Sequence, residues 1–450
     1  MTVDPSEKIR DQFDLMSYPN VPVTHTGVDG DRGVILHSFT SAWYAKTQQV
    51  VDRQDLTILD VGCGSGVTTL GLAIANPKAR IVGIDLSESS VKLASNRLSY
   101  HGFPNVEFYK LSIAQLPQFK AEQNIEFDYI NCEDTLYFLT DPVEGLQTMR
   151  AILSPTGILR VNVHSLYQRI DFFRAQSFSR LLGFFDGNPS EKEYQQISTI
   201  MEALGDHTLL KTNTWIPSDK SFGFVMMNYI MHEDKGYTIP ELFQMLRSAD
   251  LEFISMTEPE VWHLPDLFTN SMPDKFIEFF HNALPEQKLH AYELLHPVNR
   301  LLDIWCGHSG RSQEYIEICA WTEGMWESAM VYLHPVLRTD SFFQALERAI
   351  SQMQPDPHIQ KLHRSQIDPL TVILCLRFIR KSPCKLSDLV AYWCVHKPRL
   401  EAYRTVSTIV GGVVAPINKL SESQARDELR CLLSELVMDN LVMLERSRLN

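Results

Sequence analysis

Residues 58–66 have the sequence Ile-Leu-Asp-Val-Gly-Cys-Gly-Ser-Gly, and residues 81–87 have the sequence Ile-Val-Gly-Ile-Asp-Leu-Ser. An apolar strand leads into a glycine loop, a helical segment follows, and a second apolar strand ends in Asp85. Glycines let a backbone pass close to a ligand, and an acid after the second strand of a βαβ unit accepts ribose hydroxyls. The two segments therefore predict a nucleotide-type pocket with Asp85 at the ribose.

The spacing of the glycines narrows the type of ligand. A dinucleotide site has the pattern G-x-G-x-x-G, which places a pyrophosphate at a helix N-terminus. This chain has glycines at positions 62, 64 and 66, and Val67 occupies the place of the last dinucleotide glycine. The spacing therefore disfavours a dinucleotide site.

The pattern D-x-G-x-G-x-G over residues 60–66 resembles motif I of class I S-adenosylmethionine (SAM) methyltransferases. In that family the loop holds the methionine end of SAM, and the acid after the second strand holds the ribose. The cofactor-binding residues that the resemblance implies in this region are Asp60, Gly62, Cys63, Gly64, Gly66, Asp85 and Leu86.

Alternating strands and helices between residues 56 and 165 predict an α/β, Rossmann-like parallel sheet that is covered on both faces. A capping box from Thr238 to Glu241 begins a later helix, and a strand is expected near 251–257. The expected strands of the first part are 57–61, 80–85, 105–109, 127–132 and 157–163, with a helix over 87–101. The intervening residues 166–235 are predicted to form a helical insertion whose aromatic residues pack as core, with a substrate lid as the alternative.

The length of 450 residues exceeds one compact core, so we expect more than one domain. We predict a SAM-binding domain over 1–265, a helical middle region over 266–350 and a mainly α-helical, winged-helix-like module over 351–450. Residues 301–310 look like a second motif I, but Trp305 replaces its first glycine, so we assign them to a helical packing layer. For the C-terminal module we favour docking or structural packing over DNA binding.

Composition limits the function classes. The net charge of −14 argues against a dedicated nucleic-acid binder. Eight cysteines without a C-x-x-C pair indicate free thiols in a reducing compartment, and fifteen histidines show no metal-binding spacing. The N-terminus lacks the pattern of a signal peptide, and no apolar run approaches the ~18–20 residues of a membrane span. We expect a cytoplasmic protein without a metal site or a membrane segment.

The end of the fourth strand faces the methyl group in class I methyltransferases, so residues 127–142 are expected to line the reaction centre. The segment resembles motif IV, but it lacks the N-P-P-Y of nucleobase and glutamine methylation and the Pro-Cys of pyrimidine C5 methylation. A general base is needed only when the acceptor arrives protonated. The catalytic candidates are Glu133, Asp134, Tyr137 and His164, and Asn131 is a cofactor candidate.

Each base candidate has a structural alternative. His164 titrates near neutral pH, but it can equally be a satisfied histidine at a strand end. Glu133 and Asp134 can equally be a solvated pair. At the end of the third strand, Ser112 takes the place of the motif III acid that contacts adenine, and Ile113 follows it.

Two further segments resemble bacterial class I methyltransferases that carry a methyltransferase regulatory domain. They are residues 9–22, which include Ile9-Arg10-Asp11-Gln12-Phe13 and Tyr18-Pro19-Asn20, and residues 228–233, Asn-Tyr-Ile-Met-His-Glu. Some members of that group are protein lysine methyltransferases. The resemblance implies that the segment around Phe13 and Tyr18 folds over the cofactor, with Tyr18 in contact with it.

The sequence therefore predicts a SAM-dependent methyltransferase whose acceptor is unidentified. A protein side chain is one acceptor class, and a small metabolite or natural product is the other. A non-catalytic SAM-binding scaffold is the alternative of a different class. Nucleic acid is not expected as a partner, and a homodimer is left open.

Overall fold

The computed structural model describes residues 5–15, 18–26, 30–51, 53, 55–215, 219–310, 315–352, 367–408 and 420–446. The chain divides into two compact units. Unit 1 comprises residues 1–28 and 54–311, and unit 2 comprises residues 29–53 and 312–450. The boundaries expected from sequence, at 265 and 350, therefore fall inside unit 1 and unit 2 respectively.

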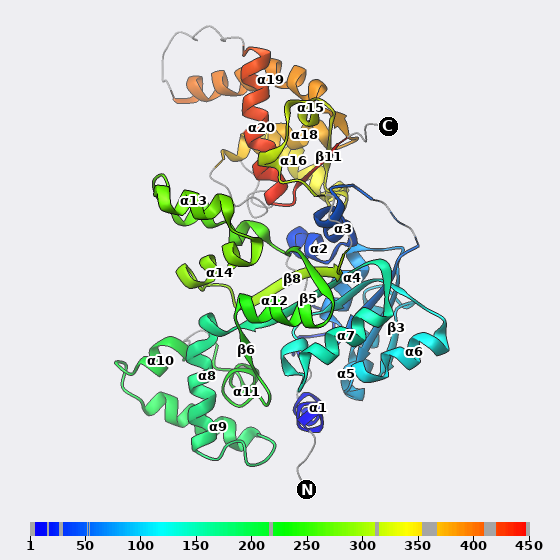
Figure 1. Cartoon of the computed structure of the whole chain (residues 1–450), viewed down its shortest axis with the longest axis vertical. Coiled ribbons are helices and arrows are strands. Elements are labelled where there is room, and N and C mark those ends of the chain that lie inside the picture. The colour runs from blue at the N-terminus through cyan, green and yellow to red at the C-terminus, as the bar shows by residue number, and fades with distance from the viewer. Residues whose placement is uncertain are drawn as a thin grey trace. The chain divides into compact units, whose positions relative to one another are not determined.

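Unit 1 is built on an eight-stranded sheet in the order β3-β2-β1-β4-β5-β8-β7, with the short β6 paired to β5 (Figure 1). Strands β1 to β5 are parallel to their neighbours, whereas β8 runs antiparallel to both β5 and β7. The strands are β1 Thr57–Val61, β2 Arg80–Asp85, β3 Glu107–Lys110, β4 Phe127–Cys132, β5 Leu153–Ser165, β6 Gly236–Tyr237, β7 Leu251–Met256 and β8 Leu301–His308. The predicted α/β, Rossmann-like architecture is confirmed.

Helices pack on this sheet in two groups. Helices α4 and α5 contact each other, and α7 contacts both α6 and α12. The helices of unit 1 outside the insertion are α1 Pro5–Leu15, α4 Val67–Ala75, α5 Glu88–Tyr100, α6 Leu116–Gln123, α7 Pro142–Ile152, α12 Ile239–Ser248, α13 Asp274–Asn282 and α14 Pro285–Leu295. Ser87 caps α5 and the Thr238–Glu241 capping box begins α12, as their sequences predict.

The helical insertion lies between β5 and β6, as predicted. It consists of α8 Leu166–Leu181, α9 Glu191–Ala203, α10 Leu209–Thr214 and α11 Phe222–Tyr229, which gather at one end of the sheet (Figure 1). The insertion has its own small core, in which Trp215 and Tyr229 pack edge to face and Ala175 of α8 is fully buried. The interpretation of its aromatic residues as core holds only in part. Phe172, Phe184 and Phe185 pack against this core while partly buried, whereas Phe178, Leu181 and Leu182 are exposed.

The assignment of residues 301–310 to a helical layer is wrong. Residues Leu301–His308 form β8, and Leu302, Ile304, Trp305 and Cys306 are buried. An apolar run of eight residues has the length of a buried strand, and a strand covered on both faces needs no alternation of polar and apolar residues. Trp305 is 1% exposed and donates a hydrogen bond from its indole nitrogen to the Tyr129 hydroxyl at 3.1 Å.

Unit 2 combines a small sheet, in the order β10-β9-β11, with helices. Tyr44 ties residues 29–53 to this sheet, because its hydroxyl donates to the Leu444 carbonyl and accepts from the Leu444 N–H. The elements are α2 Gly30–His37, α3 Phe39–Thr47, α15 Glu323–Glu327, β9 Ala329–Leu333, α16 Asp340–Gln352, α18 Pro369–Ile379, β10 Cys384–Lys385, α19 Leu386–Thr408, α20 Glu422–Met438 and β11 Val442–Arg446. The chain ends in the expected order of helix and strand, and residues 266–350, which are expected to be mostly helical, contain β8 and β9 besides their helices.

The burial of Trp305 yields a test of the β8 assignment. We expect Trp305→Ala to lower the free energy of unfolding by about 3–5 kcal/mol, because it leaves a large cavity and removes the partner of the Tyr129 hydroxyl. Urea denaturation measures the change. Tyr100→Ala is the control, since Tyr100 is 63% exposed and its loss should cost less than about 0.5 kcal/mol. Equal effects of the two variants would contradict the central position of β8.

Candidate active site

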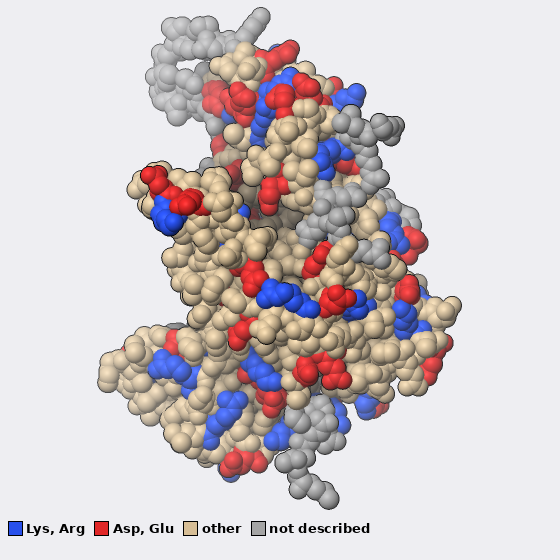
Figure 2. All heavy atoms as spheres, viewed as in Figure 1, with Lys and Arg blue, Asp and Glu red and all other residues tan. Residues whose placement is uncertain are grey.

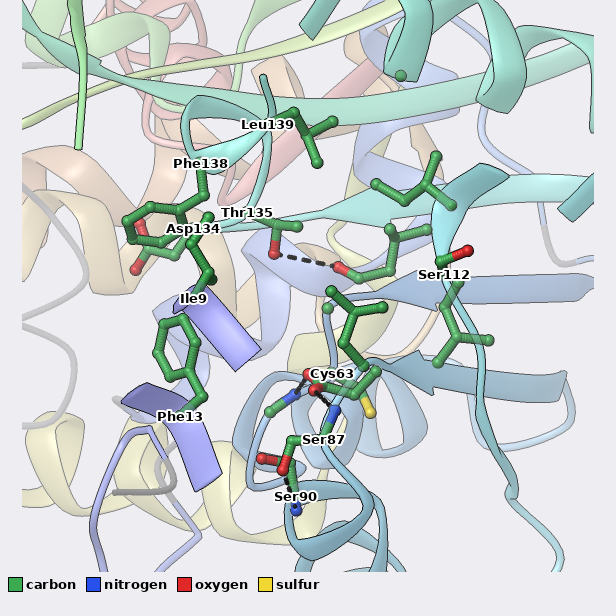
Figure 3. A pocket seen from close by; sticks show the side chains of 18 of the residues that line it. Ile9, Phe13, Cys63, Ser87, Ser90, Ser112, Asp134, Thr135, Phe138 and Leu139 are labelled. Atoms are coloured by element: carbon green, nitrogen blue, oxygen red, sulfur yellow. Dashed lines mark hydrogen bonds between the residues drawn. The ribbon is translucent and has the colours of Figure 1, made fainter. Parts of the chain in front are cut away.

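A cavity of about 650 Å³ opens at the carboxyl ends of β1, β2 and β4. This is the edge of the sheet where α/β folds bind ligands. Figure 3 shows Ile9 and Phe13 of α1 on one side of the cavity, Ser112 on the other, and Asp134 and Phe138 at one end. Of the residues expected to bind the cofactor, the lining includes Tyr18, Gly62, Cys63, Gly64, Asp85, Leu86, Ser112 and Ile113.

The glycine loop requires glycine at two pocket positions. Gly62 has φ +72°, and a Cβ atom there would lie 2.1 Å from the Thr135 hydroxyl oxygen. Gly64 has φ +49°, and a Cβ atom there would lie 2.5 Å from the Tyr18 carbonyl oxygen. Both positions combine a left-handed backbone with a close neighbour, so a larger residue would displace the pocket wall.

Asp85 joins the loops that follow β1 and β2. Its carboxylate accepts hydrogen bonds from the Gly64 N–H at 2.9 Å and the Ser87 N–H at 2.8 Å, one on each oxygen. Burial raises the pKa of Asp85, and the two backbone donors oppose that rise. Each oxygen accepts one of these bonds and has further acceptor capacity for a ligand hydroxyl.

Three residues expected at the cofactor lie outside the lining. Asp60 is 2% exposed and accepts hydrogen bonds from the Thr69 hydroxyl at 2.6 Å and the Asn131 amide at 2.9 Å. Burial raises the pKa of Asp60 to about 6. Gly66, the third glycine, packs against Ala94 of α5. Asp60 and Asn131 therefore tie α4 and β4 to β1 beneath the pocket, and Gly66 brings α4 close to α5.

Residues 18–26 form a strap over the glycine loop. The Ser65 N–H donates to the Tyr18 carbonyl at 3.0 Å, and the Ser65 hydroxyl donates to the Pro19 carbonyl at 2.9 Å. Arg97 of α5 holds the strap in place, and its side chain is inaccessible to solvent. Its guanidinium donates to the carbonyls of Val21, Pro22, Val23, His25 and Ser65.

Sequence reasoning missed Arg97. One feature of the sequence could have indicated its burial. Arg97 lies one turn after Ala94, on the helix face that was expected to point inward. A guanidinium offers five N–H donors, which suits a curved segment whose carbonyls have no sheet partner. The buried charge therefore indicates a backbone anchor.

Helix α1 covers another side of the pocket. Ile9 and Phe13 line the cavity, and Phe13 meets Phe138 edge to face at a centroid distance of 5.8 Å. Gln12, 4% exposed, donates to the Ile230 carbonyl at 2.9 Å and accepts from the His232 N–H at 3.0 Å. The N-terminal segment thus lies over the pocket, as the family resemblance implies for Phe13 and Tyr18, and α1 is attached to the end of the insertion.

Ser112 lies on the side of the pocket opposite α1, and Ile113 also lines the pocket. The Ser112 hydroxyl donates to the Gln115 side-chain oxygen at 3.0 Å as part of a capping box. This hydroxyl is therefore engaged locally, and it offers a ligand its lone pairs rather than its proton.

Glu133 and Asp134 line the pocket at the end of β4, and each has a cationic partner. The Glu133 carboxylate pairs with the buried Arg160 at 3.1 Å and accepts from the Thr68 hydroxyl at 3.1 Å. The Asp134 carboxylate pairs with Arg300 at 3.2 Å, and its backbone has φ +49°, an uncommon conformation for a non-glycine residue. The two acids are therefore oriented by the protein and do not form a simple solvated pair.

His164 and Tyr137 lie behind the pocket, not on its lining. Their rings stack at a centroid distance of 3.8 Å, and both side chains are almost fully buried. Burial lowers the pKa of His164 to about 4, and burial raises that of Tyr137 well above its usual value. Both ring nitrogens of His164 have polar partners, Asp234 at 2.6 Å and Arg300 at 2.9 Å. His164 therefore has no free nitrogen for a ligand, which speaks against its expected role as a general base.

The lining is acidic. Among the described residues it contains one basic side chain, Arg10, which pairs with Asp11 at 2.9 Å. On the face drawn in Figure 2, acidic and basic side chains are interspersed. The acids of the lining are Asp85, Glu133, Asp134, Asp141 and Glu144.

The described residues contain neither a metal-binding cluster nor a membrane-spanning helix. No group of three or more His, Cys, Asp or Glu side chains there is arranged to hold a metal ion. No helix in the same part of the chain has the length and apolar character needed to cross a membrane.

Comparison with known proteins shows what the pocket-bearing region is. The family model of a methyltransferase domain matches residues 52–200. The chain carries a methyltransferase domain. PKMT2 from Rickettsia typhi, solved in complex with AdoHcy, shares the fold with a TM-score of 0.58 at 15% identity, over 92% of this chain and 76% of that one. The predicted methyltransferase identity is confirmed for this domain.

Curated relatives match shorter parts. An uncharacterized protein of Synechococcus sp. is 27% identical over 56% of this chain and 60% of its own length. A ubiquinone biosynthesis O-methyltransferase of Leptothrix cholodnii is 33% identical over 24% of this chain and 45% of its own. The chain thus spans about half the length of these two relatives.

The low pKa of His164 gives a pH-dependence that stability measurements can check. The unfolded state binds the His164 proton with the ordinary pKa of about 6.5, so lowering the pH towards 4 favours unfolding. The free energy of unfolding of the wild type falls between pH 7 and pH 4.5. We expect this fall to be smaller by about 2 kcal/mol in His164→Gln, independently of how much the substitution destabilises the protein at pH 7. Urea denaturation at both pH values measures this, with the exposed His281→Gln as control. An unchanged pH difference would show that folding does not lower the pKa of His164.

Proposed function

We propose that the protein is a SAM-dependent methyltransferase and that its acceptor is an amine on a protein side chain, as in lysine. The observation that carries the acceptor class is the excess of acids among the described residues of the lining: five carboxylates, two of which pair with Arg160 and Arg300, against one basic side chain, Arg10, which pairs with Asp11. Such a site attracts a cationic ammonium and repels phenolate or carboxylate acceptors.

The pocket residues fit SAM. The Asp85 carboxylate is positioned for the ribose hydroxyls, and the walls around Ser112 and Ile113 suit the adenine. The loop over Gly62–Gly64 leaves space that a side chain would fill, which suits the methionine end. Binding of AdoHcy by PKMT2, which has the same fold, supports this choice of cofactor.

SAM, when bound, supplies an electrophilic methyl group, so the protein's contribution is mainly alignment. Holding donor and acceptor in attack geometry is worth about 7–11 kcal/mol. Asp134 is the side chain best placed to orient the amine, because it lies at the end of β4 and is held from behind by Arg300 and Tyr137. An amine also has to lose a proton, and the Asp134 carboxylate can accept it.

Transfer of radiolabelled methyl groups tests the acceptor class. We expect the full-length protein to label poly-L-lysine and to form methyl-lysine, which is identified after acid hydrolysis. Label confined to small molecules of a cell extract would contradict a protein acceptor. SAM binding without transfer to either would contradict catalysis and favour the scaffold alternative.

The acidic lining makes a quantitative prediction for one side chain. Glu144 is exposed at the start of α7 and contributes to the pocket wall. We expect Glu144→Gln to raise the KM for poly-L-lysine roughly two- to fivefold at low salt, since one exposed charge pair is worth up to about 1 kcal/mol. The KM should respond to salt less steeply than that of the wild type. Glu122→Gln on α6, outside the lining, is the matched control and should leave the KM unchanged.

The close approach of Gly64 to the strap makes a second prediction. We expect Gly64→Ala to weaken S-adenosylhomocysteine binding roughly ten- to a hundredfold, because the new Cβ atom displaces the Tyr18 carbonyl. Gly102→Ala is the matched control, since Gly102 has φ +86° but no atom within 4 Å of the added Cβ. Calorimetric titration measures both affinities. Equal losses in the two variants would show that backbone strain alone, and not the strap contact, lowers the affinity.

A further inference from the structure

Asp134 is held by a guanidinium that does not itself line the pocket. The terminal nitrogens of Arg300 donate to both carboxylate oxygens of Asp134, at 3.2 and 3.3 Å, and to the Nε2 atom of His164 at 2.9 Å. Tyr137 donates to the same carboxylate at 3.2 Å. Asp134 therefore sits between Arg300 and Tyr137 at the reacting end of the pocket.

The partners of His164 fix its tautomer. An arginine side chain only donates hydrogen bonds and stays protonated, so the His164 Nε2 atom must be the acceptor from Arg300. The Nδ1 atom must then carry the proton, which it donates to Asp234 at 2.6 Å. Burial lowers the pKa of His164, and a neutral ring is what this arrangement requires.

Asp234 in turn is held by the helical insertion. Its second oxygen accepts from Arg169 at 2.9 Å and from Gln176 at 2.7 Å, and both donors belong to α8. Asp234 and His164 are both nearly inaccessible to solvent. A continuous chain of hydrogen bonds thus runs from α8 through Asp234, His164 and Arg300 to Asp134.

We propose that Arg300 is a positioning residue for methyl transfer, which holds the Asp134 carboxylate in place for the acceptor, and that the insertion holds Arg300 through Asp234 and His164. This inference rests on the proposed function, and it gives the insertion a role at the reacting end besides covering the sheet. The contact matters because one terminal nitrogen of Arg300 donates to both oxygens of Asp134 while the other donates to His164, so that the planar guanidinium fixes the carboxylate in position and orientation.

Substitutions of Arg300 test whether this side chain positions the Asp134 carboxylate. We expect Arg300→Gln to lower kcat on poly-L-lysine roughly 10- to 100-fold while the affinity for S-adenosylhomocysteine changes less than about twofold. Arg300→Lys keeps the charge but cannot contact Asp134 and His164 with the same fork, so kcat should recover only in part. Arg174→Gln, an exposed arginine of α8 paired with Asp171, is the matched control and should have the wild-type kcat. Full recovery in Arg300→Lys would overturn the positioning role.

Asp234→Asn tests the relay. Arg169 and Gln176 donate to one oxygen of Asp234, so the asparagine must turn its oxygen to them and its NH₂ group to His164. His164 then takes the Nε2–H tautomer, which repels Arg300. We expect Asp234→Asn to lower kcat in the wild-type background but to add nothing to Arg300→Gln. Additive losses would overturn the relay, because residues that act through one another are not additive.

Two readouts do not depend on an acceptor. Nitrogen chemical shifts of the His164 ring should show the Nδ1–H tautomer in the wild type and the Nε2–H tautomer in Asp234→Asn. A crystal structure of Arg300→Gln should show the Asp134 carboxylate turned away from its wild-type place. An unmoved Asp134 or an unchanged tautomer overturns the inference. If both readouts agree with expectation but the wild type methylates no amine, the acceptor assignment fails and the network stands.

Discussion

The hydrogen bonds from Gly64 and Ser87 to the Asp85 carboxylate are the constraint on which the pocket depends. They join the turns after β1 and β2, so the glycine loop and the ribose position move together. Burial raises the pKa of this carboxylate, and the two backbone donors oppose that rise because they replace part of the lost water. A ligand hydroxyl can then bind an acceptor that is already oriented, so binding carries no further cost for ordering the Asp85 side chain.

The strap extends this constraint to the N-terminal segment. Gly64 leaves just enough room for the Tyr18 carbonyl, and Arg97 supplies the donors that the strap carbonyls lack in the absence of a sheet neighbour. A buried guanidinium with five carbonyl acceptors is satisfied without a carboxylate, so Arg97 neutralises none of the pocket's negative charge. The backbone of the strap therefore depends on Gly64 and Arg97, whereas the negative charge of the pocket depends on its acids. Each property can be altered by a substitution that leaves the other in place.

Much of the fold could be predicted from sequence because its signals are local. The strands β1, β2 and β4, the Ser87 cap and the Thr238 capping box each follow from a few neighbouring residues. The position of β8 could not be predicted, because its apolar run suits a buried helix as well as a strand and only long-range pairing with β5 decides between them. In the pocket, glycine spacing located the loop.

Residue roles were harder to predict, since they depend on partners far away in the chain. Asp60 belongs to the motif, but its oxygens are used by Thr69 and Asn131 beneath the pocket. His164 has the residue type of a base, yet Arg300 and Asp234, from segments more than sixty residues away, occupy both of its nitrogens.

Two arginines, Arg160 and Arg300, explain how five carboxylates can line one pocket. Arg160 neutralises Glu133 from the buried side and Arg300 neutralises Asp134, whereas Asp141 and Glu144 lie at the exposed rim, where water stabilises their charge. Arg160 also pairs with Asp303 of β8 at 2.6 Å, and burial nonetheless raises the pKa of that acid to about 6. The two cations therefore lower the cost of gathering the inner acids, although only Arg160 is buried and the Arg300 side chain is 42% exposed, and the rim acids supply the negative charge that an incoming cation meets first. A cationic acceptor would pass from water to a site where Arg160 and Arg300 already neutralise the inner acids. There, the orientation of the acceptor by Asp134 matters more than the electrostatic attraction of the acceptor to the acids.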